Sequence, residues 1–124
     1  SDLPFERYRL ENGKNLMDNN PQVQFVDYTK VTNRLDKKNK IPKNYDLTYS
    51  QAEDNLDDVK QILKTKYNIA TVFRKKLPKK WLGRKVINGD LSDLRHLEDG
   101  KKIIVGLIAK GRAIKNFNGF VQDV

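Results

Sequence analysis

The residues best suited to chemistry lie in one basic run, residues 74–85, which holds seven cations and no carboxylate. These cations are Arg74, Lys75, Lys76, Lys79, Lys80, Arg84 and Lys85. Residues 1–73 carry 12 Lys/Arg against 11 Asp/Glu, whereas residues 74–124 carry 13 against 5, so most of the net charge of +9 lies in the second part. Such a concentration of positive charge attracts polyanions. A nucleic acid, a nucleotide or another phosphate-bearing ligand is therefore the expected partner.

One aromatic side chain, Trp81, lies inside this basic run, and Phe73 lies just before it. Aromatic rings between cations are typical of proteins that bind single-stranded nucleic acid, where stacking contributes about 1–3 kcal/mol per base. The alternative interpretation, which we favour, is that Trp81 packs against the core. It would then anchor a loop that contains Pro78 and Gly83.

Polar residues also follow the segments that resemble strands, and these are Lys30, Arg74, Lys75, Asp90, Asp93, Lys110 and Arg112. Ligands collect at the carboxyl ends of parallel strands, so these side chains could form one anion-binding rim. Asp90, Asp93 and Lys110 are candidates for proton transfer there. A commoner arrangement is a turn at residues 88–89 followed by a helix that Asp90 caps. The single histidine, His96, has no second ligand of its kind, so we expect no metal site.

Five segments rich in β-branched and aromatic residues predict strands, at residues 23–28, 45–49, 69–73, 85–88 and 103–108. An apolar stripe predicts a helix over residues 52–66, and Ser50 and Glu53 have the spacing of a capping box at its start. Strand, helix and strand in this order form a βαβ unit, which favours a parallel sheet.

Four further segments have weaker patterns. We expect about one helical turn and then a loop within residues 29–44, helices near residues 12–19 and 91–97, and a loop over residues 74–84. The chain has no cysteine, which excludes disulfides and cysteine-ligated clusters within these residues and favours a reducing cytoplasm. No apolar stretch approaches the length of about 20 residues that a membrane-spanning helix needs.

The segments at residues 23–30, 47–50, 70–78, 86–90, 93–95 and 104–113, taken together, resemble the C-terminal part of a family of bacteriophage and bacterial proteins without an established activity. The resemblance implies a distant likeness to radical-SAM-type βα barrels and a cysteine-rich N-terminal part that precedes the present residues. The positions that match the family's polar motifs are Asp27, Lys30, Ser50, Asn88, Asp90, Asp93, Arg95 and Lys110. His96 departs from the family pattern, which tends toward an aromatic residue there.

These observations together predict one α/β domain over residues 1–124, the C-terminal portion of a longer protein, with a mainly parallel sheet of four to five strands or a partial barrel. We expect a phage-type accessory protein in the host cytoplasm that binds nucleic acid or a nucleotide, with no cofactor in this chain. The expected anion-binding residues are Lys30, Arg74, Lys75, Lys76, Lys79, Lys80, Trp81, Arg84, Lys85, Arg95 and Arg112. The alternative is the C-terminal half-barrel of a radical-SAM-like enzyme whose cluster-binding part is missing.

Overall fold

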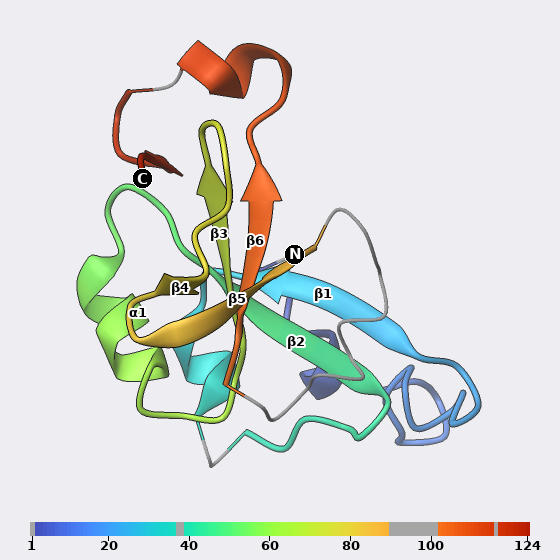
Figure 1. The fold of residues 1–124 in the computed structure, drawn as a ribbon. Coiled ribbons are helices and arrows are strands. Elements are labelled where there is room, and N and C mark those ends of the chain that lie inside the picture. Colours follow the sequence, from blue (N-terminus) through green and yellow to red (C-terminus); the bar gives the residue numbers. More distant parts are fainter. Residues whose placement is uncertain (1, 37–38, 90–101, 116) are drawn as a thin grey trace.

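A computed structural model describes residues 2–36, 39–89, 102–115 and 117–124. Over these residues the chain forms a mostly parallel sheet of seven strands with one α-helix, which confirms the expected α/β class (Figure 1). The strands are β1 (Phe25–Thr29), β2 (Tyr45–Ser50), β3 (Ile69–Phe73), β4 (Lys80–Trp81), β5 (Arg84–Asn88), β6 (Ile104–Ile108) and β7 (Val121–Gln122). Their order is β1-β2-β3-β6-β5-β4, and β7 pairs with β3.

All five expected strands are present, and each begins and ends within two residues of the expected positions. They pair in parallel, β1 with β2, β2 with β3, β3 with β6 and β6 with β5. Parallel neighbours need a crossover connection of a dozen or more residues, and the segments after β1 and β2 supply it. The parallel sheet predicted from the strand–helix–strand pattern is therefore confirmed.

Two strands were not expected, because β4 and β7 are only two residues long and carry little apolar pattern. β4 lies in the stretch predicted to be loop and pairs with β5 in the antiparallel direction. β2 contacts β3 only through the pairs Tyr49↔Ile69 and Ser50↔Ala70, after which β7 pairs with Val72 and Phe73. The strand path runs from β1 to β4 without closing over the described residues, so the structure shows a sheet rather than a barrel.

The helix α1 (Leu56–Ile62) is much shorter than the predicted helix over residues 52–66, and the predicted capping box is wrong. Ser50 ends β2, and the Gln51 amide still donates to the Ala70 carbonyl at 2.9 Å, so the chain remains part of the sheet there. Asn55 makes the turn instead. Its Oδ1 accepts from the Ala52 amide at 2.7 Å, and its Nδ2 donates to the Ser50 carbonyl at 3.0 Å.

Short 3-10 helices are found at η1 (Phe5–Arg7), η2 (Thr32–Leu35) and η4 (Gly111–Lys115). The helical turn predicted within residues 29–44 is confirmed by η2. The helix predicted near residues 12–19 is wrong, because this segment forms turns, with Asn15 Oδ1 accepting from the Asp18 amide at 2.8 Å. Asparagine competes with helices through such local hydrogen bonds. The helix predicted over residues 91–97 lies outside the described residues.

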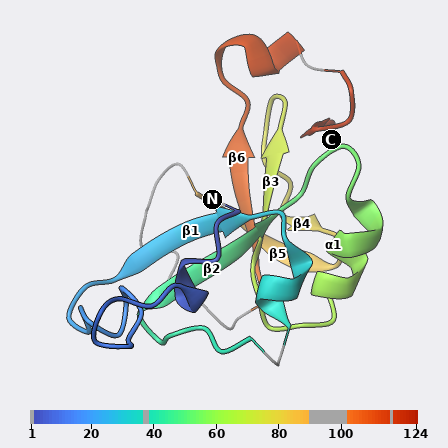
Figure 2. The same ribbon diagram turned by 180° about the vertical axis from the view of Figure 1, so that it is seen from behind.

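One face of the sheet carries the main core. Leu47, Tyr49 and Ile69 from the sheet pack with Val59 of α1 and Leu35 of η2, and all five are at most 3% exposed. Figure 2 shows η1, η2 and α1 together on this side of the sheet. The burial of this apolar surface is the main stabilising contribution to the fold. A smaller cluster centred on Ala70, Ile103 and Val105 covers the opposite face.

A buried polar network attaches the N-terminal segment to the sheet. Arg34 pairs with Glu6 at 2.9 Å and donates to the Tyr45 hydroxyl at 2.8 Å, which in turn donates to Asp27 Oδ2 at 2.8 Å. Burial would raise the pKa of Glu6, but hydrogen bonds from Arg34 and Asn39 outweigh it, so this pKa is lowered. The carboxylate therefore stays charged inside the protein.

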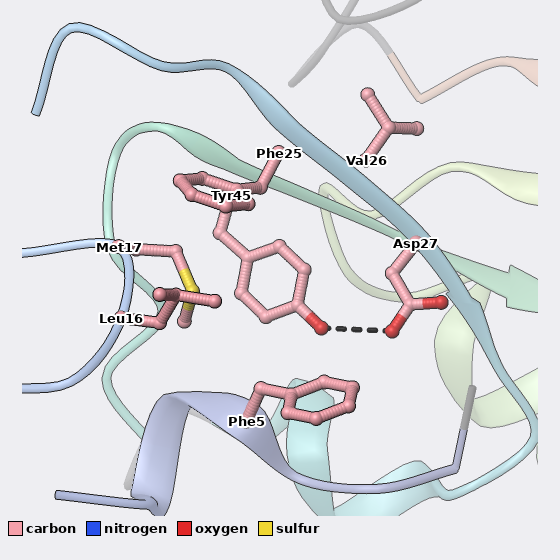
Figure 3. A pocket seen from close by; sticks show the side chains of 7 residues that line it. All are labelled: Phe5, Leu16, Met17, Phe25, Val26, Asp27 and Tyr45. Atoms are coloured by element: carbon pink, nitrogen blue, oxygen red, sulfur yellow. Dashed lines mark hydrogen bonds between the residues drawn. The ribbon is translucent and has the colours of Figure 1, made fainter. Parts of the chain in front are cut away.

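The network borders an apolar hollow of about 280 Å³ (Figure 3). Phe5 and Leu16 of the N-terminal segment lie on one side of it, and Asp27 of β1 lies on the other. The Tyr45 ring points across the hollow, and burial, followed by the Asp27 carboxylate, raises the pKa of its hydroxyl. The hydroxyl therefore serves as a fixed hydrogen-bond donor at neutral pH.

Candidate anion-binding surface

The basic run predicted from the sequence folds as a β-hairpin that follows β3. β4 and β5 are joined by a two-residue turn at Leu82 and Gly83, whose φ angles are 51° and 81°. Two successive positive φ angles define the tight turn that matches the twist of paired strands, and glycine adopts such an angle at little cost. Lys80 lies opposite Lys85, and Trp81 lies opposite Arg84. Since side chains alternate along a strand, the hairpin has two chemically different faces.

Trp81 occupies the inner face of the hairpin and is half-buried. Its ring meets Phe73 edge to face, with 5.2 Å between the ring centroids, and its Nε1 donates to Gln51 Oε1 at 3.0 Å. The same Gln51 oxygen accepts from the Thr71 hydroxyl at 2.8 Å. These contacts agree with the packing interpretation of Trp81, whose ring fixes the hairpin against the sheet.

Arg84 also lies on the inner face, where it caps the end of α1. Its guanidinium donates to the carbonyl oxygens of Ile62, Leu63, Thr65 and Tyr67 at 2.6–3.3 Å. A helix ends with unpaired carbonyls and a partial negative charge, which a cation stabilises. Burial lowers the pKa of the Arg84 guanidinium, and the carbonyls provide the compensating hydrogen bonds. We therefore place Arg84 with the scaffold and not with the ligand-facing cations.

The outer face of the hairpin presents lysines to solvent. Lys80 and Lys85 are directly opposite each other on neighbouring strands, an arrangement that places like charges close together and is unfavourable without a counterion. Lys75, Lys76 and Lys79 are exposed on the preceding loop. We call these five residues the hairpin lysines. Within the described part of the chain, none of the five forms an ion pair.

Arg74 lies at the carboxyl end of β3 but is only 8% exposed. Its Nε donates to Asp123 at 2.7 Å, its Nη1 donates to the Ile114 carbonyl, and its guanidinium lies 4.0 Å from the centroid of the Phe117 ring. The residues after η4 thus fold back over the end of β3, as the red segment in Figure 1 shows. Arg74 is used to attach this C-terminal segment.

Lys30 lies at the same edge of the sheet, after β1, with its ammonium 5.6 Å from the Phe120 ring centroid. A hollow of about 230 Å³ beside it is lined by Asp2 and Ser50. Asp2 accepts from the Lys30 amide at 2.8 Å, and this bond is the main reason that the pKa of Asp2 is lowered. The charged Asp2 carboxylate therefore lies where the rim was expected to bind an anion, and it would repel one.

The other predicted site residues are divided between this rim and the positions outside the described ranges. Lys110 and Arg112 are exposed after β6, at the edge where Arg74 also lies. Asp90, Asp93 and Arg95 lie outside the described residues, so the candidate carboxylates are not placed. Sequence reasoning missed Asp2 and Asp123 at the rim. No local pattern signals them, since both reach the rim through tertiary folding of the terminal segments.

A family model described as Gene product 88 matches residues 1–123. The chain belongs to the Gene product 88 family. No curated protein and no solved structure matches this sequence. Membership agrees with the resemblance to a phage-type family and with a phage accessory protein, and the match covers nearly the whole chain.

Membership in the Gene product 88 family does not support the more detailed expectations that the resemblance implied. The matched residues contain no cysteine, so neither the cysteine-rich N-terminal part nor the likeness to radical-SAM barrels is supported. The half-barrel enzyme, the alternative function, depended on that likeness. No helix in the described ranges is long and apolar enough to cross a membrane.

Proposed function

We propose that this phage accessory protein binds nucleic acid through the outer face of the β4–β5 hairpin and the loop before it, in the cytoplasm of the host cell. The observation that carries the proposal is the pair Lys80 and Lys85, which face each other across the hairpin without a carboxylate partner among the described residues. A phosphate placed between two ammonium groups would remove their repulsion. Lys75, Lys76 and Lys79 extend this positive surface along the chain.

The inner face of the hairpin supports this role because it holds the lysine-bearing backbone in place. Trp81 is fixed by Gln51 and Phe73, and Arg84 is fixed by four carbonyls at the end of α1. A preorganised surface loses less conformational freedom on binding than a flexible loop does. Lysines act as point charges on flexible stems, so the surface suits contacts to the phosphate backbone more than the reading of bases.

Binding of this kind depends strongly on salt, since each neutralised phosphate releases counterions. Fluorescence anisotropy with labelled single-stranded and duplex DNA at two or more salt concentrations measures the dependence. If all five hairpin lysines contact phosphates of a duplex, the slope of log K against log salt is about −4 to −5. Absence of binding at low salt, or binding that is insensitive to salt, would contradict the proposal.

The double variant Lys80→Gln/Lys85→Gln tests the hairpin itself. Removing two phosphate contacts is expected to reduce the magnitude of the salt slope by about 2 and the affinity at low salt by about tenfold or more. Lys14→Gln/Lys43→Gln is the matched control, because it removes two exposed lysines that lie away from the hairpin. Both variants are expected to retain the fold, since all four lysines are exposed, and circular dichroism checks this. Equal losses in the two variants would mean that only net charge matters.

A further inference from the structure

A second basic region lies before β3 and β6, at the strand ends opposite to the rim that carries Lys30, Arg74 and Lys110, and was not predicted from the sequence. It is a hollow of about 600 Å³ whose rim carries Lys40, Lys64, Lys66 and Lys102. The described residues that line it include no Asp or Glu, and in the same ranges all four lysines are exposed and form no ion pair. Its volume is within the range of about 300–1,000 Å³ that is typical of small-molecule sites.

The floor of this hollow is apolar. Leu35 is 3% exposed, and Ile41 and the Tyr67 ring are half-buried beside it. The Lys66 ammonium lies 5.9 Å from the centroid of the Tyr67 ring. A flat hydrophobic or aromatic group could therefore rest on the floor while an anionic group reaches the lysines at the rim. A few charged groups around an apolar surface are the usual composition of a ligand pocket.

The position of the hollow against the end of α1 makes its lysines available to an external anion. Carbonyls at the end of a helix normally attract nearby cations. Here Arg84 already donates to the carbonyls of Leu63, Thr65 and Tyr67, and the last two of these residues line the hollow. Lys64 and Lys66 are thus not required to satisfy the helix end, and their charges remain exposed at the rim.

The backbone at Lys102 also has an uncommon conformation. Lys102 has a φ of 55°, in the left-handed region that residues other than glycine rarely adopt. Such positions cluster at ligand-binding segments, although they also occur in tight turns such as the one at Leu82. The strain occurs directly before β6, where the chain passes the hollow.

We propose that this hollow binds a nucleoside phosphate, with the base on the apolar floor and the phosphate among the four lysines. The hollow adjoins the hairpin, since Arg84 donates to the carbonyls of Thr65 and Tyr67 in its lining, but none of the five hairpin lysines is among its described lining residues. Tyr67 and Lys102 precede β3 and β6, whereas Lys75 and Lys76 follow the opposite end of β3. The proposal does not depend on nucleic-acid binding by the hairpin, and either one can fail without the other.

Isothermal titration calorimetry of the intact chain with AMP, ADP, ATP, adenosine and inorganic phosphate tests this proposal. Because both parts of the ligand contribute, at least one nucleotide is expected to bind about tenfold or more tightly than adenosine or phosphate alone. Binding of inorganic phosphate as tight as that of every nucleotide would overturn the proposal, because the floor would then contribute nothing. So would the absence of nucleotide binding at millimolar concentration.

The variant Lys64→Gln/Lys66→Gln locates the binding. It is expected to weaken nucleotide binding about tenfold or more, since charged hydrogen bonds to phosphate are lost. Lys14→Gln/Lys115→Gln removes the same charge at two exposed positions outside both the hollow and the hairpin, and is the matched control, which should leave nucleotide affinity unchanged. Equal effects of the two variants would overturn the site. DNA affinity measured on the same variants reports separately on the hairpin.

Discussion

The strand-end rim and the outer face of the hairpin are both rich in cations, but only the rim has carboxylates beside them among the described residues. At the rim, Arg74 pairs with Asp123, and Asp2 lies beside Lys30. On the hairpin, Lys80 and Lys85 face one another and solvent. A count of charges along the sequence makes the two regions look alike. Their partners distinguish them, and these partners come from distant parts of the chain.

The same division separates arginine from lysine in this protein. Arg34, Arg74 and Arg84 are at most 8% exposed, and each holds two segments together through several hydrogen bonds. Arginine suits this role because its planar guanidinium offers five donors and remains charged when buried. Within the part of the chain that the structure describes, the hairpin lysines make no such side-chain bonds, which leaves their charge available for a ligand. The comparison predicts that arginine substitutions affect stability and lysine substitutions affect binding.

The strongest test compares the neighbours Arg84 and Lys85. Arg84→Met removes the donor to four carbonyls at the end of α1 while retaining the length of the side chain. Because buried carbonyls lose their partners, unfolding free energy is expected to fall by about 3 kcal/mol. Lys85→Met should change it by less than about 0.5 kcal/mol, since the residue is exposed. Urea denaturation measures both, and similar losses would remove the distinction between the two faces.

Much of the sheet could be predicted because its five main strands are apolar, β-branched segments separated by crossover lengths. The local sequence pattern gave wrong predictions where contacts between segments distant in the sequence decide the structure. Ser50 and Glu53 have capping-box spacing, but the bond from the Gln51 amide to Ala70 extends the sheet and delays the helix to Leu56. β7 could not be predicted, because its two residues become a strand only by pairing with the end of β3.

For the candidate site, the cationic residues could be predicted from the sequence, but the residues that contact them could not. Trp81 was expected to pack, and it does. Arg84 is surrounded by carbonyls that belong to a segment about 20 residues away, which no local motif indicates. The lysine-rimmed hollow combines Lys40, Lys64 and Lys102 from three segments. Each of these lysines is unremarkable in the sequence, and their grouping is produced only by the fold.

A smaller effect is expected at the tip of the hairpin. Leu82 has a φ of 51° and is 38% exposed, so its left-handed backbone costs free energy without a full burial gain. Leu82→Asn, which produces an Asn-Gly turn, is expected to raise unfolding free energy by about 1 kcal/mol and leave DNA affinity unchanged. Thermal or urea denaturation checks the first and anisotropy the second. A loss of stability would show that the Leu82 side chain contributes more by packing than its backbone costs.

The test that compares rim and hairpin most directly is Asp123→Asn, for which only a small stability effect is expected. The Asp123 side chain is 70% exposed, so its ion pair with Arg74 is screened by solvent and contributes less than about 1 kcal/mol. Hydrogen exchange at the Arg74 amide, which donates to Gln122, should accelerate as β7 loosens. Asp123 shares a hollow with Lys75 and Lys76, but Lys80 and Lys85 are not among the residues that line it. If Lys80 and Lys85 carry most of the binding, DNA affinity is expected to change less than threefold, as for one added charge away from that pair. A gain as large as the loss in Lys80→Gln/Lys85→Gln would instead assign the binding to the rim, with Asp123 as the group that competes with phosphate for Arg74.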